Sequence, residues 1–284
     1  MIMGTVVDLH LHTTVSDGRL TPTEVIQLVA RQGLKVVSVS DHDITDGLAE
    51  AYQAIKEFPD MRLIPGLELS TDIPGDEIHM LGYFIQYEDD EFQDILSRFR
   101  EGRLERGQAM VQKLAEYGLH IEWERVREIA GCGSVGRPHI ALALVERGYF
   151  KEPKDAFAEY LGRNGLAYAQ REKMTPEEGV AMLSRIGGVA VLAHPAQLVD
   201  LENKVKYLKK AGLVGMEVHY SQYSPDTIAR LLDIAKRHDL IPCGGSDYHG
   251  LGNTGELLPG KMGPPMETVE RLEEASRKLT QASS

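Results

Sequence analysis

The chain has 284 residues, of which 26 % are charged, and its net charge is −12. This composition is typical of a globular protein, and the acidic excess argues against a broad basic surface for duplex DNA. No apolar run is long enough to cross a membrane, no signal pattern opens the chain, and Cys132 and Cys243 are too far apart for a CxxC site. We therefore expect a cytoplasmic protein without membrane association, and nothing indicates an obligate protein partner.

Seven short apolar runs, rich in β-branched residues, predict strands. They lie near residues 5–9, 36–40, 62–67, 77–84, 189–193, 214–218 and 240–245. Helical patterns separate most of these runs, and two begin with a capping-box pattern, Thr21-Pro22-Thr23-Glu24 and Thr175-Pro176-Glu177-Glu178. Strands that alternate with helices predict an α/β fold with a parallel sheet that is closed or nearly closed.

The segment 91–173 interrupts this alternation, because its pattern predicts helices and no strand. The expected helices span residues 91–117, 122–129, 138–147 and 153–161. We therefore expect a barrel domain formed by residues 1–90 and 174–284. Residues 91–173, called the insertion below, would be a helical insertion after the fourth strand that caps the substrate site.

Histidines and carboxylates follow or end six of the predicted strands. The candidate metal ligands are His10, His12, Asp17, His42, Glu68, His79, His194, Asp247 and His249. Residues i and i+2 of a strand point to the same side, so the His-x-His and Asp-x-His pairs can each grip one ion. Any one of these residues could be an ordinary turn or strand residue, but their concurrence at the carboxyl ends of strands predicts one metal centre, as in parallel α/β barrels.

These segments resemble the PHP (polymerase and histidinol phosphatase) superfamily. The matching segments are Asp8–Thr13, Ser16–Gly18, Ser40–Asp43, Gly66–Glu68, Ile78–His79, Ala193–Pro195 and Gly245–Gly250. The resemblance implies a distorted seven-stranded (β/α) barrel. It also implies two to three divalent ions, of manganese, iron or zinc, bound at this rim.

The resemblance further implies how the ligands divide among the ions. His10, His12, Glu68 and Asp247 would hold the first ion; Glu68, His79 and His194 the second; and Asp17, His42 and His249 the third. A hydroxide that bridges the first two ions would attack phosphorus. Asp41 and Asp43 would contact the ligands and not the ions, and would orient ligand imidazoles or carry protons. Three bound ions outweigh the three ligand carboxylates in charge, which favours a phosphate substrate.

The segment Ser134-Val135-Gly136-Arg137-Pro138-His139 ends a glycine-rich loop and begins a predicted helix. Free N–H groups at a helix start, beside an arginine, can bind an anion. The chemistry alone fits equally well a solvated charge at Arg137 and an ordinary first-turn residue at His139. Gly136–Ala141 resembles one PHP branch, the nucleoside 3′,5′-bisphosphate phosphatases and the RNase AM-type 5′→3′ exoribonucleases. This similarity implies that Ser134, Arg137 and His139 contact a substrate phosphate, and that Arg171 and Lys173 assist them.

The sequence thus predicts a metal-dependent phosphoesterase. Its substrate would be a small nucleotide, a nucleoside 3′,5′-bisphosphate, or the 5′-terminal nucleotide of a short RNA. One alternative is a histidinol-phosphate-type phosphatase, and another is a PHP module that binds metal without catalysis. An amidohydrolase shares the His-x-His of the first strand but lacks the pattern of Glu68 and Asp247-x-His249.

Overall fold

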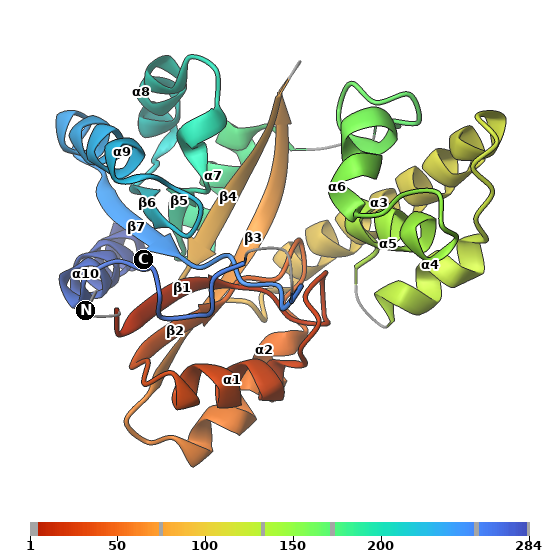
Figure 1. The fold of residues 1–284 in the computed structure, drawn as a ribbon. Coiled ribbons are helices and arrows are strands. Elements are labelled where there is room, and N and C mark those ends of the chain that lie inside the picture. Colours follow the sequence, from red (N-terminus) through yellow and green to blue (C-terminus); the bar gives the residue numbers. More distant parts are fainter. Residues whose placement is uncertain (1–4, 74–75, 132–133, 171–173, 253–255, 283–284) are drawn as a thin grey trace.

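A computed structural model describes the chain except residues 1–4, 74–75, 132–133, 171–173, 253–255 and 283–284 (Figure 1). Its described part contains a seven-stranded sheet whose strand order follows the chain. The strands are β1 (Val7–Leu11), β2 (Val36–Val39), β3 (Arg62–Ile73), β4 (Asp76–Tyr83), β5 (Val189–Leu192), β6 (Gly215–Tyr220) and β7 (Ile241–Gly245).

The sheet is nearly closed because the chain that leaves β7 pairs with β1. The backbone N–H of Asp247 donates to the carbonyl of His10 at 2.9 Å, and the N–H of His12 donates to the carbonyl of Tyr248 at 2.9 Å. The expected distorted α/β barrel is confirmed. Its closure brings the ligands of the first and last strands to the same rim.

One part of the expected topology is wrong: the sheet is not wholly parallel. β4 runs antiparallel to both β3 and β5, whereas the remaining neighbours are parallel. β3 extends to Ile73, well beyond the predicted end at residue 67, so only two residues separate it from β4. Such a short connection permits only an antiparallel hairpin, because a parallel return needs a crossover of a dozen or more residues. Glu68 and His79 consequently lie within strands and not at carboxyl ends.

Helices cover the outside of the barrel (Figure 1). They are α1 (Pro22–Arg31), α2 (Gly47–Ala54), η1 (Ile55–Glu57), α7 (Pro176–Arg185), η3 (Pro195–Gln197), α8 (Leu201–Ala211), α9 (Pro225–Arg237) and α10 (Met266–Ala282). Both predicted capping boxes form, at Thr21 and at Thr175, so the starts of α1 and α7 are fixed by their local sequence. Within the described residues, no helix is both long and apolar enough to span a membrane.

The insertion stands to one side of the barrel (Figure 1). It contains α3 (Asp90–Glu116), α4 (Trp123–Ala130), α5 (Arg137–Glu146), α6 (Pro153–Ala156) and η2 (Phe157–Leu161). Its buried apolar side chains, such as Met110, Leu114, Val126, Ile140 and Leu144, form a cluster of their own. The separate cluster supports our proposal that the insertion is a domain distinct from the barrel.

Three arginines of the insertion bind residues of the barrel, two of them on the β3–β4 hairpin. The pairs are Arg103 Nε with Asp43 Oδ2 (2.8 Å), Arg137 Nη2 with Glu77 Oε2 (2.7 Å) and Arg163 Nη2 with the carbonyl oxygen of Ile73 (2.9 Å). Arg103 also reaches the hairpin, because its Nη2 donates to Ser70 Oγ at 2.7 Å. The hairpin that carries Glu68 and His79 is thus one part of the barrel to which the insertion is attached.

Candidate metal centre

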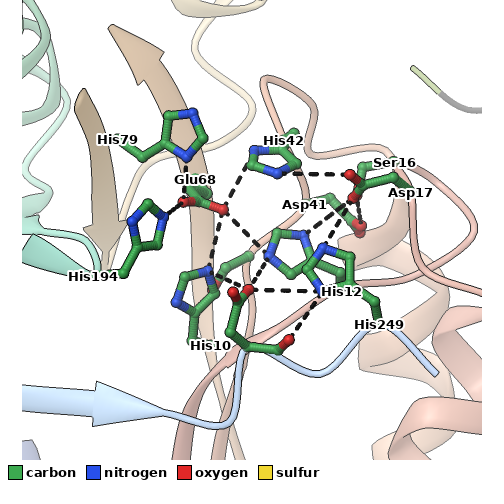
Figure 2. A network of polar contacts seen from close by, with 12 residues as sticks. His10, His12, Ser16, Asp17, Asp41, His42, Glu68, His79, His194 and His249 are labelled. Carbon is green, nitrogen blue, oxygen red and sulfur yellow. Dashed lines mark hydrogen bonds and ion pairs between the residues drawn. The ribbon is translucent and has the colours of Figure 1, made fainter. Parts of the chain in front are cut away.

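The nine side chains that the sequence predicts as ligands converge at one rim of the barrel (Figure 2). They come from β1, the loops after β1 and β2, the β3–β4 hairpin, and the chain that follows β5 and β7. Three groups of donor atoms lie close enough to hold a metal ion. They are His10, His12, Glu68 and Asp247; His12, Asp17, His42 and His249; and His42, Glu68 and His79.

Glu68 lies at the centre of the cluster and its side chain is fully buried. Its Oε1 is near His79 Nδ1 (2.8 Å) and His194 Nε2 (2.9 Å), and its Oε2 is near His10 Nε2 (3.1 Å), His12 Nε2 (3.2 Å) and His42 Nδ1 (3.3 Å). Burial alone would raise the pKa of this carboxyl, but the surrounding histidines hold its pKa well below the usual value. Glu68 is therefore ionised, with one oxygen directed to each side, as a bridging ligand requires.

Asp247 completes the first group from the chain that follows β7 and pairs with β1. Its Oδ1 lies 3.3 Å from His10 Nε2 and 3.1 Å from His12 Nε2. The two histidines point to the same side, as expected for alternate residues of an extended chain, and their ring centroids are 5.0 Å apart. The structure therefore brings together the four side chains that the family resemblance assigns to the first ion.

The other two groups differ in composition from the expected ones. His249 Nε2 lies 3.3 Å from Asp17 Oδ1, and His42 Nε2 lies 3.8 Å from Asp17 Oδ2. His12 joins this group because its Nδ1 lies 3.7 Å from Asp17 Oδ1, and its ring stacks on that of His249 with centroids 4.1 Å apart. Near Glu68, it is His42 that groups with His79, whereas His194 approaches Glu68 Oε1 without joining the group.

Two buried nitrogen atoms of the cluster fit a role as metal ligands. Among the described residues, His12 Nε2 and His42 Nδ1 form no hydrogen bond of proper geometry, although carboxylate oxygens of Asp247 and Glu68 lie 3.1 and 3.3 Å from them. Burial lowers the pKa of His42 to about 3, against the opposing effect of Glu68 and Asp17, so its imidazole is neutral. Neutral imidazole nitrogens and carboxylates are ligands suited to divalent zinc, manganese and iron. The residues present therefore fit divalent metal ions.

Sequence reasoning did not identify a buried carboxylate, Glu217, that contacts His10 and the backbone of His194 on the side away from the other ligands. Glu217, in β6, is fully buried; its Oε1 lies 3.0 Å from His10 Nδ1, and its Oε2 accepts a hydrogen bond from the backbone N–H of His194 at 2.7 Å. A similar support comes from Tyr220, whose hydroxyl donates to Asp247 Oδ2 at 2.7 Å. The one available signal was an acidic residue within the apolar run of β6.

Asp41 and Asp43, which were expected to orient imidazoles or carry protons, mainly hold loops. Asp41 accepts hydrogen bonds from Thr13 and Ser16, and it reaches His12 only through Ser16, whose Oγ is 3.5 Å from His12 Nδ1. Asp43 accepts from the backbone N–H of Ser70 at 2.7 Å and from the guanidinium of Arg103. Both carboxylates thereby fix the backbone from which ligands project.

The residues predicted to bind a substrate phosphate lie at the start of α5. Gly136 caps this helix, and its backbone N–H donates to His139 Nδ1 at 2.9 Å. The backbone N–H of Ser134 donates to the carbonyl of Val15 at 3.0 Å, which joins the insertion to the loop that carries Asp17. Ser134 Oγ is buried and has no hydrogen-bond partner among the described residues. Arg171 and Lys173, predicted to assist, lie outside the described residues.

A nearly closed α/β barrel with histidines and carboxylates clustered at one rim is the arrangement of a metal-dependent hydrolase. The comparisons with known proteins agree, because residues 8–211 match the PHP domain family. The chain is 34 % identical over 252 residues to a 5′-3′ exoribonuclease Rnm of Salmonella typhimurium, covering 85 % of this chain and 84 % of the relative. It is 33 % identical over 257 residues to a 3′,5′-nucleoside bisphosphate phosphatase of Chromobacterium violaceum, covering 88 % of this chain and 89 % of the relative.

A solved structure from Bifidobacterium adolescentis, considered a metal-dependent phosphoesterase, superposes with a TM-score of 0.86 at 32 % identity. The match covers 95 % of this chain and 96 % of that one. The chain belongs to the PHP domain family. It is a metal-dependent phosphoesterase, as its sequence predicts, and the expected enzyme class is confirmed.

Proposed function

We propose that the chain hydrolyses a phosphate ester of a small nucleotide, either a nucleoside 3′,5′-bisphosphate or the 5′-terminal nucleotide of a short RNA. The observation that carries this proposal is the attachment of the α5 start to the metal-centre loop, through Ser134 N–H and the carbonyl of Val15. The printed names of the two relatives, an exoribonuclease and a bisphosphate phosphatase, support the same substrate class.

A substrate with two phosphate groups fits two adjacent binding regions. The cluster around Glu68 would hold two to three divalent ions, which supply Lewis-acid charge and a more acidic water for attack on the scissile phosphate. The start of α5 would bind the other phosphate with backbone N–H groups, the Arg137 guanidinium and the Ser134 hydroxyl. The insertion thus acts as a cap that selects the substrate, while the barrel carries the chemistry.

His194 joins none of the three metal-holding groups, so its imidazole is the one best placed to pass a proton to the leaving oxygen. Its side chain is 32 % exposed, whereas those of Glu68, His10 and His12 are almost completely buried. Its backbone N–H donates to Glu217 Oε2 at 2.7 Å and its ring nitrogen Nε2 lies 2.9 Å from Glu68 Oε1, so the imidazole is held at the rim. A histidine at this position combines access to the substrate with a fixed orientation, as proton transfer requires.

Steady-state kinetics with added manganese tests the proposal. We expect kcat/KM for adenosine 3′,5′-bisphosphate or a short 5′-phosphorylated RNA to exceed that for histidinol phosphate by at least about a hundredfold. Arg137→Ala should lower the value for the bisphosphate by about tenfold or more, because it removes a charge-assisted contact to phosphate. Arg147→Ala, at the exposed end of the same helix, is the matched control. Faster turnover of histidinol phosphate would contradict the proposed substrate.

A further inference from the structure

Glu77 lies between the two regions that the proposed function assigns to the two phosphates. It belongs to β4, two residues before His79, so both side chains lie on the same face of the strand. Its Oε2 accepts a hydrogen bond from Arg137 Nη2 at 2.7 Å, and its Oε1 is 3.8 Å from His79 Nε2. Neither the metal ligands nor the predicted phosphate contacts include this residue.

The contact with Arg137 is much the stronger of the two. A separation of 2.7 Å is that of a charge-assisted hydrogen bond, whereas 3.8 Å is beyond hydrogen-bond distance. Both members of the Arg137–Glu77 pair are largely buried, with side chains 18 % and 16 % exposed, so water screens the pair only in part. Glu77 therefore holds the side chain of Arg137 more strongly than it interacts with the imidazole of His79.

The pair leaves most of the guanidinium available. Arg137 engages Glu77 through Nη2, and its guanidinium carbon lies 5.8 Å from the centre of the Phe157 ring. Its Nε and Nη1 donate to no partner among the residues that the structure describes. An arginine presents five N–H donors in a rigid fork, so one edge can be held by a carboxylate while the rest binds a phosphate.

We propose that Glu77 is a positioning residue that holds Arg137 in place for the substrate phosphate which is not cleaved. This inference rests on the proposed function, because it requires a substrate with a second phosphate. Arginine is flexible, and a side chain already ordered before binding loses less entropy when its ligand arrives. Glu77 thereby favours substrates that carry two phosphates over simple monoesters.

The test compares two substrates in Glu77→Ala and Glu77→Gln. Adenosine 3′,5′-bisphosphate uses both regions, whereas p-nitrophenyl phosphate has one phosphate and requires only the metal centre. In Glu77→Ala we expect the KM for the bisphosphate to rise about tenfold with kcat within about twofold, and the KM for p-nitrophenyl phosphate to change by less than about twofold. Glu77→Gln should show a smaller rise, because its amide oxygen still accepts from Arg137.

A binding measurement supplies a readout that does not depend on turnover. We assign the 3′-phosphate to the metal centre, so adenosine 5′-monophosphate carries only the phosphate that is not cleaved. Its calorimetric titration into the manganese-loaded protein should show about tenfold weaker binding in Glu77→Ala than in the unmodified chain. The matched control is Glu146→Ala, which breaks an arginine–glutamate pair, Arg125 Nε to Glu146 Oε2 at 2.8 Å, on the exposed surface of the insertion. This control should leave all constants unchanged.

Three outcomes would overturn the inference. An unchanged or lower KM for the bisphosphate in Glu77→Ala would show that the carboxylate does not position Arg137, or that it competes with the phosphate. A parallel fall in kcat for both substrates, together with reduced metal content, would show that Glu77 acts through His79. An unmodified chain that has no preference for the bisphosphate over p-nitrophenyl phosphate would contradict the proposed substrate, and the inference with it.

Discussion

His10 Nδ1 lies 3.0 Å from Glu217 Oε1, and both side chains are completely buried. The ring's other nitrogen, Nε2, faces Glu68 and Asp247. A carboxylate on one ring nitrogen fixes the tautomer and orientation of an imidazole, so that the opposite nitrogen is ready to bind a metal ion. His10 is consequently set as a ligand by a residue of β6, far from it in sequence.

Glu217→Gln should therefore weaken metal binding and activity by about tenfold to a hundredfold, since partners of metal-binding histidines have effects of that size. Metal content after dialysis and the manganese concentration for half-maximal activity measure the effect. Glu202→Gln is the control, because it changes a histidine–glutamate pair outside the metal centre. In that pair Glu202 Oε1 lies 3.2 Å from His238 Nε2. Unchanged manganese dependence in Glu217→Gln would contradict this role.

Removal of metal should abolish phosphoesterase activity. The buried His12 Nε2 and His42 Nδ1 form no hydrogen bond of proper geometry among the described residues, and bound ions would satisfy their lone pairs. We expect dialysis against a chelator to reduce the rate by at least about a thousandfold, and added manganese to restore it. The melting temperature should rise as metal is added back, because an ion that binds only the folded chain stabilises it. Full activity of a preparation shown to contain no metal would refute this prediction.

Arg103→Met should destabilise the fold by about 3 kcal/mol, because it removes one partner of a buried ion pair and leaves the charge of Asp43 in a region of low dielectric. Urea unfolding measures the difference. In the double variant Arg103→Met with Asp43→Asn, the loss should be smaller than the sum of the two single losses by about 1 kcal/mol or more. Strict additivity would show that the two residues do not interact energetically.

The stability that Asp89 contributes at the start of α3 depends on pH. Its side chain accepts a hydrogen bond from the backbone N–H of Phe92 at 2.9 Å, and this bond, with a second from Arg185, lowers the pKa of the carboxyl below its usual value of 3.8. The folded chain thus favours the ionised form. The resulting stability is present above about pH 4 and is lost as pH falls below the usual value.

Asp89→Asn should accordingly destabilise the chain by about 0.5 kcal/mol at pH 7, and by less as pH falls towards 3.5. Urea unfolding at the two pH values measures the change. Asp94→Asn is the control, since Asp94 is an exposed residue of the same helix that does not cap it. An equal difference at both pH values would show that the charge of Asp89 has no part in stability.

Sequence patterns predicted the features that depend on neighbouring residues. The capping boxes at Thr21 and Thr175 and the positions of the strands follow from local spacing, and the structure has them. The antiparallel direction of β4 differs from the expected one because the alternation of Leu67, Leu69, Thr71 and Ile73 continues β3 beyond its expected end. That extension leaves too few residues for a parallel return.

The residues that hold the side chains of the candidate site in place could not be predicted from local sequence patterns. Glu217 and His10 are 207 positions apart, and a carboxylate within a strand does not reveal which histidine it faces. The pair Arg137–Glu77 spans 60 positions and joins the insertion to the barrel. Such contacts depend on how strands from both ends of the chain close, which no short segment determines.

The three arginines that join the insertion to the barrel bear on how substrate range can change in evolution or by engineering. Replacing the whole insertion with one from a relative would leave the metal ligands intact, yet it would deprive Asp43 and Glu77 of their arginines. A transplanted insertion should therefore work only where basic side chains return at the positions of Arg103, Arg137 and Arg163. If the insertion selects the substrate, as we propose, an exchange of the insertion can alter the substrate range only when these three positions keep basic side chains.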